Sequence, residues 1–342
     1  MKLNFTWEAY VRAASYTAKG TAKAVLSITS HDMPNPSAGE VLVKLHYSGI
    51  NPSDVKMRVG ESLGGMTMPF PEVIPHSDGA GTVEAVGASV EGFAKGDRVY
   101  VFNGGFKRAF GTAAEYIAID AAQVAPLPEG ISFSHGACLG IPAMTAVHAV
   151  TRAPVIEGKT ILISSGGGVV GRYCIEVARG LGAANIIATA SSPTSTATAK
   201  SAGADHVIDY NAPNLAEQIM ELSAGQGIDH AVEAEFGLNA ATLGHVINVN
   251  GSIAAYGSAL NKTPTLPFYD FMFKNITIHT LLVYLLDAET RAKDVAVIHR
   301  LLEAGAITEN IAAVMPLDQI AAAHEMVEAS NKSGSVLLDL TS

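Results

Sequence analysis

A glycine-rich turn between two apolar segments is the strongest chemical signal in the chain. Residues 161–183 read ILISSGGGVVGRYCIEVARGLGA, so an apolar run leads into G-x-G-x-x-G and then into apolar residues at helical spacing. Such glycines allow a tight turn and let a pyrophosphate approach the main chain, while the helix N-terminus offers N–H groups to the anion. This order predicts a dinucleotide site, and a glycine-rich turn without a ligand is the alternative. The cofactor-binding residues expected here are Gly166, Gly168, Val169, Val170 and Gly171.

The end of the next predicted strand bears on which dinucleotide binds. Residues 184–200 read ANIIATASSPTSTATAK, and Ala190, Ser191 and Ser192 stand where an acidic residue would bind the ribose 2′-hydroxyl of NAD. A carboxylate repels a 2′-phosphate, whereas small hydroxyls and main-chain N–H groups can donate to it. We therefore predict NADPH as the cofactor, although no Arg or Lys stands at this strand end. The alternative is an exposed Ser/Thr turn that enters a helix.

The elements that must position these residues are of two kinds. Residues 41–124 contain short β-leaning runs separated by turn residues, which predicts an irregular antiparallel barrel or sandwich. Further along, apolar strands alternate with helical patterns, which predicts a parallel sheet wrapped by helices. Helical patterns at 288–304 and 317–330 and a final strand, SVLLDL, are expected to complete the first domain. The predicted fold class is α/β, with a Rossmann-type doubly wound parallel sheet in residues 129–284 and a barrel domain in residues 1–128 and 285–342.

The composition excludes several classes of protein. The 342 residues are 48% hydrophobic and carry a formal net charge of −10, which disfavours nucleic acid and anionic membranes as partners. The N-terminal segment does not resemble a signal peptide, and no apolar run approaches about 18 residues, so we expect a soluble, cytoplasmic protein. The two cysteines, Cys138 and Cys174, lie far apart in apolar stretches, which favours buried thiols over a disulfide framework or a four-cysteine zinc site.

A set of motifs in a fixed order carries a family resemblance. With the glycine turn at mid-chain, these motifs are GINPSD, GAGTVEAVG, KGDRVY, GIPAMTAVHA and SGSVLLDL. From about Gly39 to Leu340 the chain resembles the medium-chain dehydrogenase/reductase superfamily, and within it the zinc-independent quinone oxidoreductases related to zeta-crystallin. The resemblance implies a GroES-like β-barrel catalytic domain beside the Rossmann domain. It also implies a homodimer, formed by edge pairing of the strand ITIHTLLVY.

The zinc-ligand positions of the superfamily are changed in this chain. Where the zinc alcohol dehydrogenases have a Cys, the His of Gly-His-Glu and a second Cys, this sequence has Asn51, Ser77 and Ile141. A catalytic zinc needs three N, S or O ligands from the protein, and neither Asn51 nor Ile141 is a plausible one, so we expect no metal. An alternative metal site could use His76, Asp78 and Asp54 as nitrogen and oxygen ligands. No other His or Cys in the motifs would complete that site.

The resemblance also assigns roles to single residues. Asn51 matches an Asn beside the nicotinamide, Gly257 and Ser258 match a loop near the nicotinamide ribose, and Tyr210 matches a Tyr near the 2′-phosphate. Asn51 could instead be a turn residue before a proline, and Tyr210 could simply pack. His76 stands where this branch often has Gly, and its imidazole could orient a substrate oxygen or pass a proton. The alternative, which we favour, is a structural histidine that hydrogen-bonds a neighbouring loop.

The expected reaction follows from the changed zinc positions. A nicotinamide delivers hydride without a protein nucleophile, and a quinone or an enone delocalises the oxygen charge that a zinc would otherwise stabilise. We therefore expect NADPH-dependent reduction of a quinone or an α,β-unsaturated carbonyl. The alternatives are an enoyl or alkenal reductase of the same superfamily and a non-catalytic, crystallin-like NADPH-binding protein, which only an assay of turnover distinguishes from an enzyme.

Overall fold

The computed structural model describes residues 10–61, 65–329 and 333–342. The chain forms two compact units, the first made of residues 1–141 and 309–342 and the second of residues 142–308. Within these described residues, every helix is too short or too polar to cross a membrane. Both cysteines are buried free thiols, as expected.

The first unit is built on a mixed seven-stranded sheet, with a separate two-stranded antiparallel sheet formed by β1 and β2. Its order is β14-β15-β3-β4-β5-β7, with β6 also paired to β3; β14 and β15 are parallel and the other pairs antiparallel. The strands are β1 (Tyr10–Ser15), β2 (Ser27–Asp32), β3 (Glu40–Ile50), β4 (Asp78–Val86), β5 (Arg98–Val101), β6 (Tyr116–Asp120), β7 (Val124–Pro126), β14 (Ile311–Pro316) and β15 (Ser335–Asp339). The helices are α1 (Ala22–Val25), α2 (Pro52–Val59), α3 (Phe133–Gly136) and α11 (Ile320–Glu328), with 3-10 turns at Ala121–Gln123 and Leu317–Gln319.

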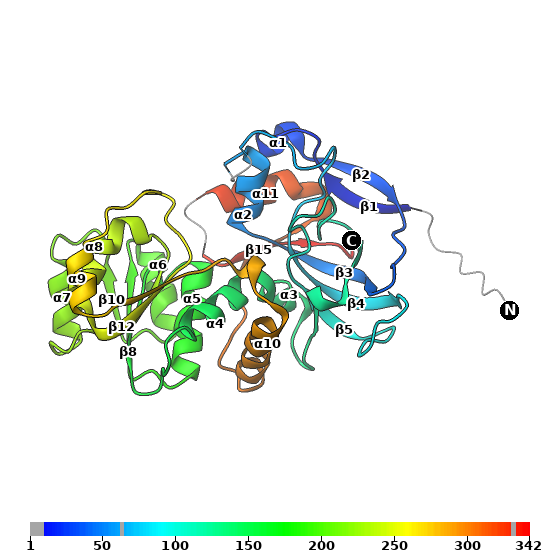
Figure 1. Cartoon of the computed structure of the whole chain (residues 1–342). Coiled ribbons are helices and arrows are strands. Elements are labelled where there is room, and N and C mark those ends of the chain that lie inside the picture. The colour runs from blue at the N-terminus through cyan, green and yellow to red at the C-terminus, as the bar shows by residue number, and fades with distance from the viewer. Residues whose placement is uncertain (1–9, 62–64, 330–332) are drawn as a thin grey trace. The chain divides into compact units, whose positions relative to one another are not determined.

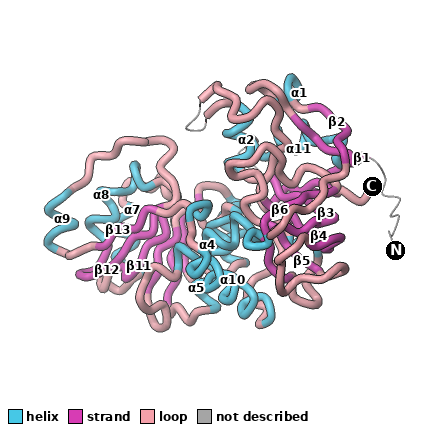
Figure 2. The backbone as a smooth tube through the Cα atoms, turned by 45° about the vertical axis from the view of Figure 1, so that its right-hand side comes forward, coloured by secondary structure: helices cyan, strands magenta, loops and turns pink. Residues whose placement is uncertain are grey.

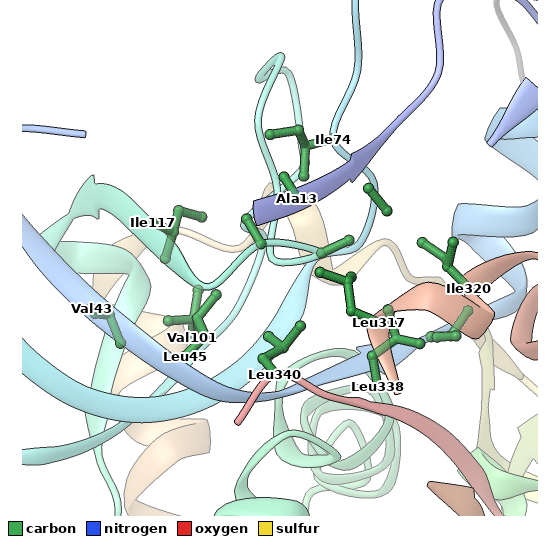
Figure 3. Close-up of a cluster of buried hydrophobic side chains, with 14 of the residues drawn as sticks. Ala13, Val43, Leu45, Ile74, Val101, Ile117, Leu317, Ile320, Leu338 and Leu340 are labelled. Carbon is green, nitrogen blue, oxygen red and sulfur yellow. The ribbon is translucent and has the colours of Figure 1, made fainter. Parts of the chain in front are cut away.

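The core of this unit lies under the long strand β3. Val43 and Leu45 alternate with the exposed Lys44, as expected for a strand with one buried face. Figure 3 shows these side chains packed in one cluster with residues from β5, β6, β15 and α11. Residues from the beginning and the end of the chain thus share one core, and α11 also contacts α1 and α2 (Figure 1).

The second unit is a parallel six-stranded sheet in the order β10-β9-β8-β11-β12-β13 (Figure 2). Numbered by sequence within the unit, this order is 3-2-1-4-5-6, which is the order of the Rossmann fold. The strand order reverses between β8 and β11, although these two strands are parallel. The strands are β8 (Thr160–Ile163), β9 (Asn185–Ala190), β10 (His206–Asp209), β11 (Ile228–Glu233), β12 (Ile247–Ala255) and β13 (Thr277–Thr280). The helices are α4 (Met144–Val150), α5 (Val169–Gly180), α6 (Pro193–Ser201), α7 (Leu215–Leu222), α8 (Phe236–Val246), α9 (Phe268–Phe273) and α10 (Ala288–Glu303), with a 3-10 turn at Val283–Leu285. A π-helical turn, Leu139–Ala143, spans the boundary of the units. The predicted fold class is confirmed.

The observed boundaries lie at 141/142 and 308/309 and differ from the expected ones at 128/129 and 284/285, so α3 belongs to the first unit and α10 to the second. On α10, the buried Asp294 lies 2.9 Å from His148 Nδ1 on α4, and Leu301 packs against the surface of α5 at Gly180. The amphipathic pattern of α10 predicted a helix but not the helices against which its apolar face would pack. The second helical pattern and the final strand do return to the first unit, as α11 and β15.

Candidate functional site

The glycine turn, Ser164–Gly168, joins β8 to α5. Its glycines and Gly171 in α5 are required for different structural reasons. A Cβ added at Gly171 would lie 2.2 Å from the carbonyl oxygen of Ser165, and one at Gly166 would lie 2.7 Å from the Cβ of Ala188 on β9. These two glycines therefore allow the helix to approach the sheet. A Cβ at Gly168, the N-cap of α5, would meet nothing nearer than 3.3 Å. Gly168 is therefore less crowded than the other two glycines, and it directly precedes the first-turn N–H groups, which have no partners within the helix.

Gly167 is a residue of this turn that the sequence motif did not single out. A Cβ added there would lie 2.4 Å from the backbone of Ser195, in the first turn of α6. The run of three consecutive glycines was the available signal, because G-x-G-x-x-G leaves its second position free. The turn therefore packs against α6 as well as against the sheet.

The structure brings Ser191 and Tyr210 together at the carboxyl ends of β9 and β10. Ser191 Oγ donates to Tyr210 Oη at 2.6 Å, and the Tyr210 side chain is half exposed. Ser192 lies beside them as the N-cap of α6, where its Oγ accepts a hydrogen bond from the Ser195 N–H at 3.1 Å. This edge also borders a cavity of about 730 Å³ whose lining includes Thr189, Tyr210 and Glu235. Hydroxyl groups therefore occupy the position of the acidic residue of NAD-binding folds.

The sequence analysis missed a buried carboxylate at the end of β11, next to β8, where the strand order reverses. Glu233 ends β11, is 1% exposed, and accepts hydrogen bonds from Ser164 Oγ at 2.9 Å, Asn239 Nδ2 at 3.0 Å and the Glu235 N–H at 2.6 Å. Burial raises the pKa of Glu233, while these donors lower it. Glu233 therefore fixes Ser164 at the start of the glycine turn. An acidic residue at the end of a predicted strand was the only signal in the sequence.

Gly257 and Ser258 follow β12 at the same edge of the sheet. A Cβ at Gly257 would lie 2.2 Å from the carbonyl oxygen of Ala234, so glycine allows this loop to pass close to the end of β11. Ser258 Oγ accepts from the Gly237 N–H at 2.9 Å and donates to the Asn261 carbonyl. The Ser258 side chain therefore bonds within the loop and also joins the loop to the first turn of α8.

Asn51 lies in the first unit, between β3 and α2, and is 6% exposed. Its main-chain N–H donates to Asp54 Oδ2 at 2.7 Å, and its side-chain Nδ2 donates to Asp78 Oδ2 at 2.8 Å. Asp78 also accepts from the Ile141 N–H, at 3.0 Å to each carboxylate oxygen. Desolvation raises the pKa of Asp54 to about 8 and that of Asp78 to about 7, although the N–H donors lower both. Two of the changed zinc-ligand positions, 51 and 141, thus meet at one carboxylate.

The donor atoms at these positions do not fit a zinc ion. Ile141 offers no side-chain donor, and one N–H of the Asn51 amide is bonded to Asp78. In the part of the chain that the structure describes, no three His, Cys, Asp or Glu side chains are placed to hold a metal together. The three residues of the alternative ligand set bond to other groups and not to a common point: His76 to Ser48, and Asp78 and Asp54 to the side chain and the main chain of Asn51.

His76 lies in a buried chain of hydrogen bonds and is 1% exposed. Its Nδ1 lies 2.9 Å from Ser48 Oγ and its Nε2 lies 2.8 Å from His324 Nε2, while Arg58 Nε donates to His324 Nδ1 at 3.3 Å. Because arginine is always a donor, His324 must carry its hydrogen on Nε2 and donate to His76, which in turn donates from Nδ1 to Ser48. Desolvation holds the pKa of both histidines well below the ordinary value, so both rings are neutral at pH 7.

This geometry does not support the catalytic role considered for His76, because both ring nitrogens already have protein partners. It fits the structural alternative. The backbone of His76 is left-handed, with φ of 76°, which explains why glycine suits this position. His324 is 248 residues away in the chain, so no pattern in the sequence indicated this pairing.

Two family models match the chain, each over part of its length. Residues 37–129 match the alcohol dehydrogenase GroES-like domain, and residues 169–300 match the zinc-binding dehydrogenase domain. The quinone oxidoreductase of Rattus norvegicus is 28% identical over 310 residues, covering 90% of this chain and 91% of its own. The chain belongs to the medium-chain dehydrogenase/reductase superfamily. Within the superfamily it lies in the quinone oxidoreductase branch, as the sequence motifs indicated.

Further relatives define how far this family assignment reaches. The 2-methylene-furan-3-one reductase of Solanum lycopersicum is 33% identical over 228 residues, which are 64% of this chain and 58% of its own. Among solved structures, an NAD-dependent alcohol dehydrogenase has a TM-score of 0.85 at 28% identity, and a mycobacterial protein complexed with NADPH has 0.83 at 25%. Each match covers 96% of this chain and 99% of the other. This medium-chain protein is therefore an oxidoreductase that uses a nicotinamide cofactor and acts on a small molecule.

Proposed function

We propose that this medium-chain protein reduces a quinone or an α,β-unsaturated carbonyl with NADPH and without zinc. The observation that carries the proposal is the arrangement of Asn51, Asp78 and the Ile141 main chain where the zinc branch has metal ligands. These groups supply no Lewis acid to an alcohol or a simple carbonyl. Substrates that delocalise developing oxygen charge through conjugation do not require one.

The bound cofactor supplies hydride, and the residues of the chain bind and orient its parts. In the proposal, the N-terminus of α5, which begins directly after Gly168, receives the pyrophosphate. Ser191, Ser192 and Tyr210 surround the 2′-phosphate, Gly257 and Ser258 form the loop near the nicotinamide ribose, and Asn51 lies beside the nicotinamide.

The preference for NADPH rests on the hydroxyl pair of Ser191 and Tyr210 at the end of β9. Titration of the protein with NADPH and NADH tests it, and equal affinities or tighter binding of NADH would overturn it. Ser191→Asp should reverse the preference, because a carboxylate accepts from a 2′-hydroxyl and repels a phosphate. Ser201→Asp, at the far end of α6, is the matched control and should leave the preference unchanged.

A panel of quinones, enones, alkenals and simple aldehydes, assayed by NADPH oxidation, tests the reaction. We expect turnover of quinones or enones, unchanged by chelators, and little turnover of aldehydes. Reduction of an enone is a second candidate function, because a relative at 33% identity is a 2-methylene-furan-3-one reductase. Binding of NADPH without turnover of any substrate would instead favour the crystallin-like alternative. About one zinc per chain by elemental analysis would contradict the proposal.

We also propose that the protein is a cytoplasmic homodimer in which the edge strand β13 pairs with its copy. β13 is the last strand in the sheet order, and the adjacent α9 exposes three aromatic residues. Their exposed fractions are 60% for Phe268, 66% for Tyr269 and 76% for Phe273. A mass of one chain by light scattering would exclude the dimer.

A further inference from the structure

Three successive main-chain N–H groups of the loop after β12 converge on one carboxylate. The Ala259 N–H donates to Glu235 Oε2 at 2.7 Å, and the Leu260 N–H lies 3.1 Å from both carboxylate oxygens. The Asn261 N–H donates to Oε1 at 3.3 Å. Successive N–H groups that face the same side form an anion-binding concavity called a nest, and Glu235, the N-cap residue of α8, supplies its anion.

Neutral hydrogen bonds also join this loop to α8. The Gly237 N–H donates to Ser258 Oγ at 2.9 Å, and Asn261 Nδ2 donates to the Gly237 carbonyl at 3.0 Å. Both bonds involve side chains of the loop, whereas the Glu235 carboxylate holds its main chain. Hydrogen bonds to a carboxylate are roughly twice as strong as neutral ones, so Glu235 is the main determinant of the path of residues 259–261.

The loop forms part of the wall of the cavity of about 730 Å³ at the carboxyl edge of the sheet. Leu260 is 78% exposed and lines this cavity together with Glu235. The same cavity is lined by Ser165 of the glycine turn and by Tyr210, and all of these residues belong to the second unit. The carboxylate that fixes the loop therefore fixes one side of this cavity.

We propose that Glu235 is a positioning residue that holds residues 259–261 as a fixed wall of the cofactor cavity. The inference rests on the proposed function, in which residues around this cavity bind the dinucleotide. Glu235 acts through the loop and not through contact with a phosphate, which its carboxylate would repel. In the proposed function the loop lies near groups that NADPH and NADH share, so its loss should weaken the binding of both alike.

The experiment compares two variants that remove the same charge from the same cavity. Glu217→Ala is the matched control, because the exposed Glu217 also lines the cavity. Removing a negative charge should by itself strengthen binding of an anionic cofactor, so this variant should bind NADPH and NADH at least as tightly as the wild type. Glu235→Ala should instead bind both about tenfold more weakly, with an unchanged ratio of the two dissociation constants.

Acetate tests whether the empty nest causes the loss. In Glu235→Ala the three N–H groups lack their carboxylate, and an acetate ion can take its place. We expect acetate, and not the neutral acetamide at equal ionic strength, to restore at least half of the lost affinity on a logarithmic scale. Glu235→Gln keeps one acceptor oxygen in the nest, so it should lose only about threefold in affinity and should not respond to acetate.

Amide hydrogen exchange measures the hold of Glu235 on the loop without any cofactor. The N–H groups of Ala259 and Leu260 should exchange at least tenfold faster in Glu235→Ala than in the wild type, and in Glu217→Ala at the wild-type rate. Circular dichroism and the unfolding midpoint show whether each variant is folded. If Glu235→Ala is not, faster exchange and weaker binding in Glu235→Gln carry the test.

Three results would overturn the inference: unchanged exchange in folded Glu235 variants, equal changes of affinity in Glu235→Ala and Glu217→Ala, or no response of Glu235→Ala to acetate. A wild-type protein that binds neither dinucleotide would instead contradict the proposed function. The exchange rates would still report whether Glu235 holds the loop, so the two failures are distinguishable.

Discussion

The glycine turn of the second unit and the Asn51 region of the first unit are built in opposite ways. The glycine turn depends on main-chain atoms and on the absence of side chains, and its contacts lie between Ser164 and Ser195 apart from hydrogen bonds such as that from Ser164 to Glu233. The Asn51 region comprises the Asn51–Asp78 pair and the nearby buried chain of Ser48, His76, His324 and Arg58. Its buried side chains form hydrogen bonds with one another, and these join residues as far apart as Arg58 and His324. The first kind of site should fail when a Cβ is added, and the second when a partner is removed.

The largest combined effect, on stability and on cofactor binding together, is expected from adding a side chain at the glycine turn. Gly171→Ala places a Cβ 2.2 Å from a main-chain oxygen that cannot move without displacing α5. We expect the free energy of unfolding to fall by about 1–3 kcal/mol, with a loss of cofactor affinity of roughly tenfold or more. Denaturant unfolding and cofactor titration measure the two effects.

Gly168→Ala is the control for that change, because its Cβ would lie 3.3 Å from the nearest atom. It should weaken cofactor binding while changing the free energy of unfolding by less than about 1 kcal/mol. Equal destabilisation by both variants would show that the two glycines do not have separate roles.

Removing a partner from the buried chain tests the other region. His324→Ala leaves Arg58 Nε and His76 Nε2 without partners, so we expect the free energy of unfolding to fall by about 3 kcal/mol. His76→Gly also breaks the chain but relieves the left-handed backbone at φ of 76°, so it should cost about 1 kcal/mol less.

If the role of His76 is structural, both variants should turn over substrate at rates near that of the wild type under conditions where they remain folded. A large loss of turnover in folded His76→Gly protein, at unchanged cofactor affinity, would return His76 to the catalytic residues.

A smaller effect is expected from the titration of Asp54. Desolvation raises its pKa from 3.8 to about 8, so the folded state holds this proton more tightly than the unfolded state. The associated stabilisation is complete below pH 3.8 and is lost as the pH rises through about 8. Asp54→Asn removes this dependence, so its stability relative to the wild type should increase by up to about 1.4 kcal/mol for each pH unit between about pH 5 and 8.

Urea unfolding of both proteins across this pH range measures that difference. His76 and His324 titrate in the opposite sense, because desolvation lowers their pKa, but they are present in both proteins and cancel in the comparison. A stability difference that does not change with pH would show that Asp54 is not a buried titrating group.

The smallest effect is expected at the exposed edge of the second unit. Tyr210→Phe removes the hydroxyl that accepts from Ser191 at 2.6 Å. We expect NADPH affinity to fall about two- to fivefold, with no change in NADH affinity, because only the 2′-phosphate reaches these hydroxyls in the proposal. A parallel loss for both cofactors would place Tyr210 elsewhere in the site.

The sequence by itself determined the Rossmann sheet, the position of the glycine turn and the absence of an acidic residue after β9. These features depend on residues near one another in the chain, where periodicity and glycine spacing report local backbone geometry directly. The same local signal predicted α10 as a helix, yet could not predict that Asp294 and Leu301 would pack in the second unit.

Only the tertiary structure decided which polar side chains meet. Asn51 and Asp78 are 27 residues apart, and His76 and His324 are 248 apart, so no spacing rule connects them. Glu233 became recognisable only when the sheet order placed β11 beside β8. The physical reason is that a buried polar group must find a partner, but its identity depends on which distant segments the hydrophobic core brings together.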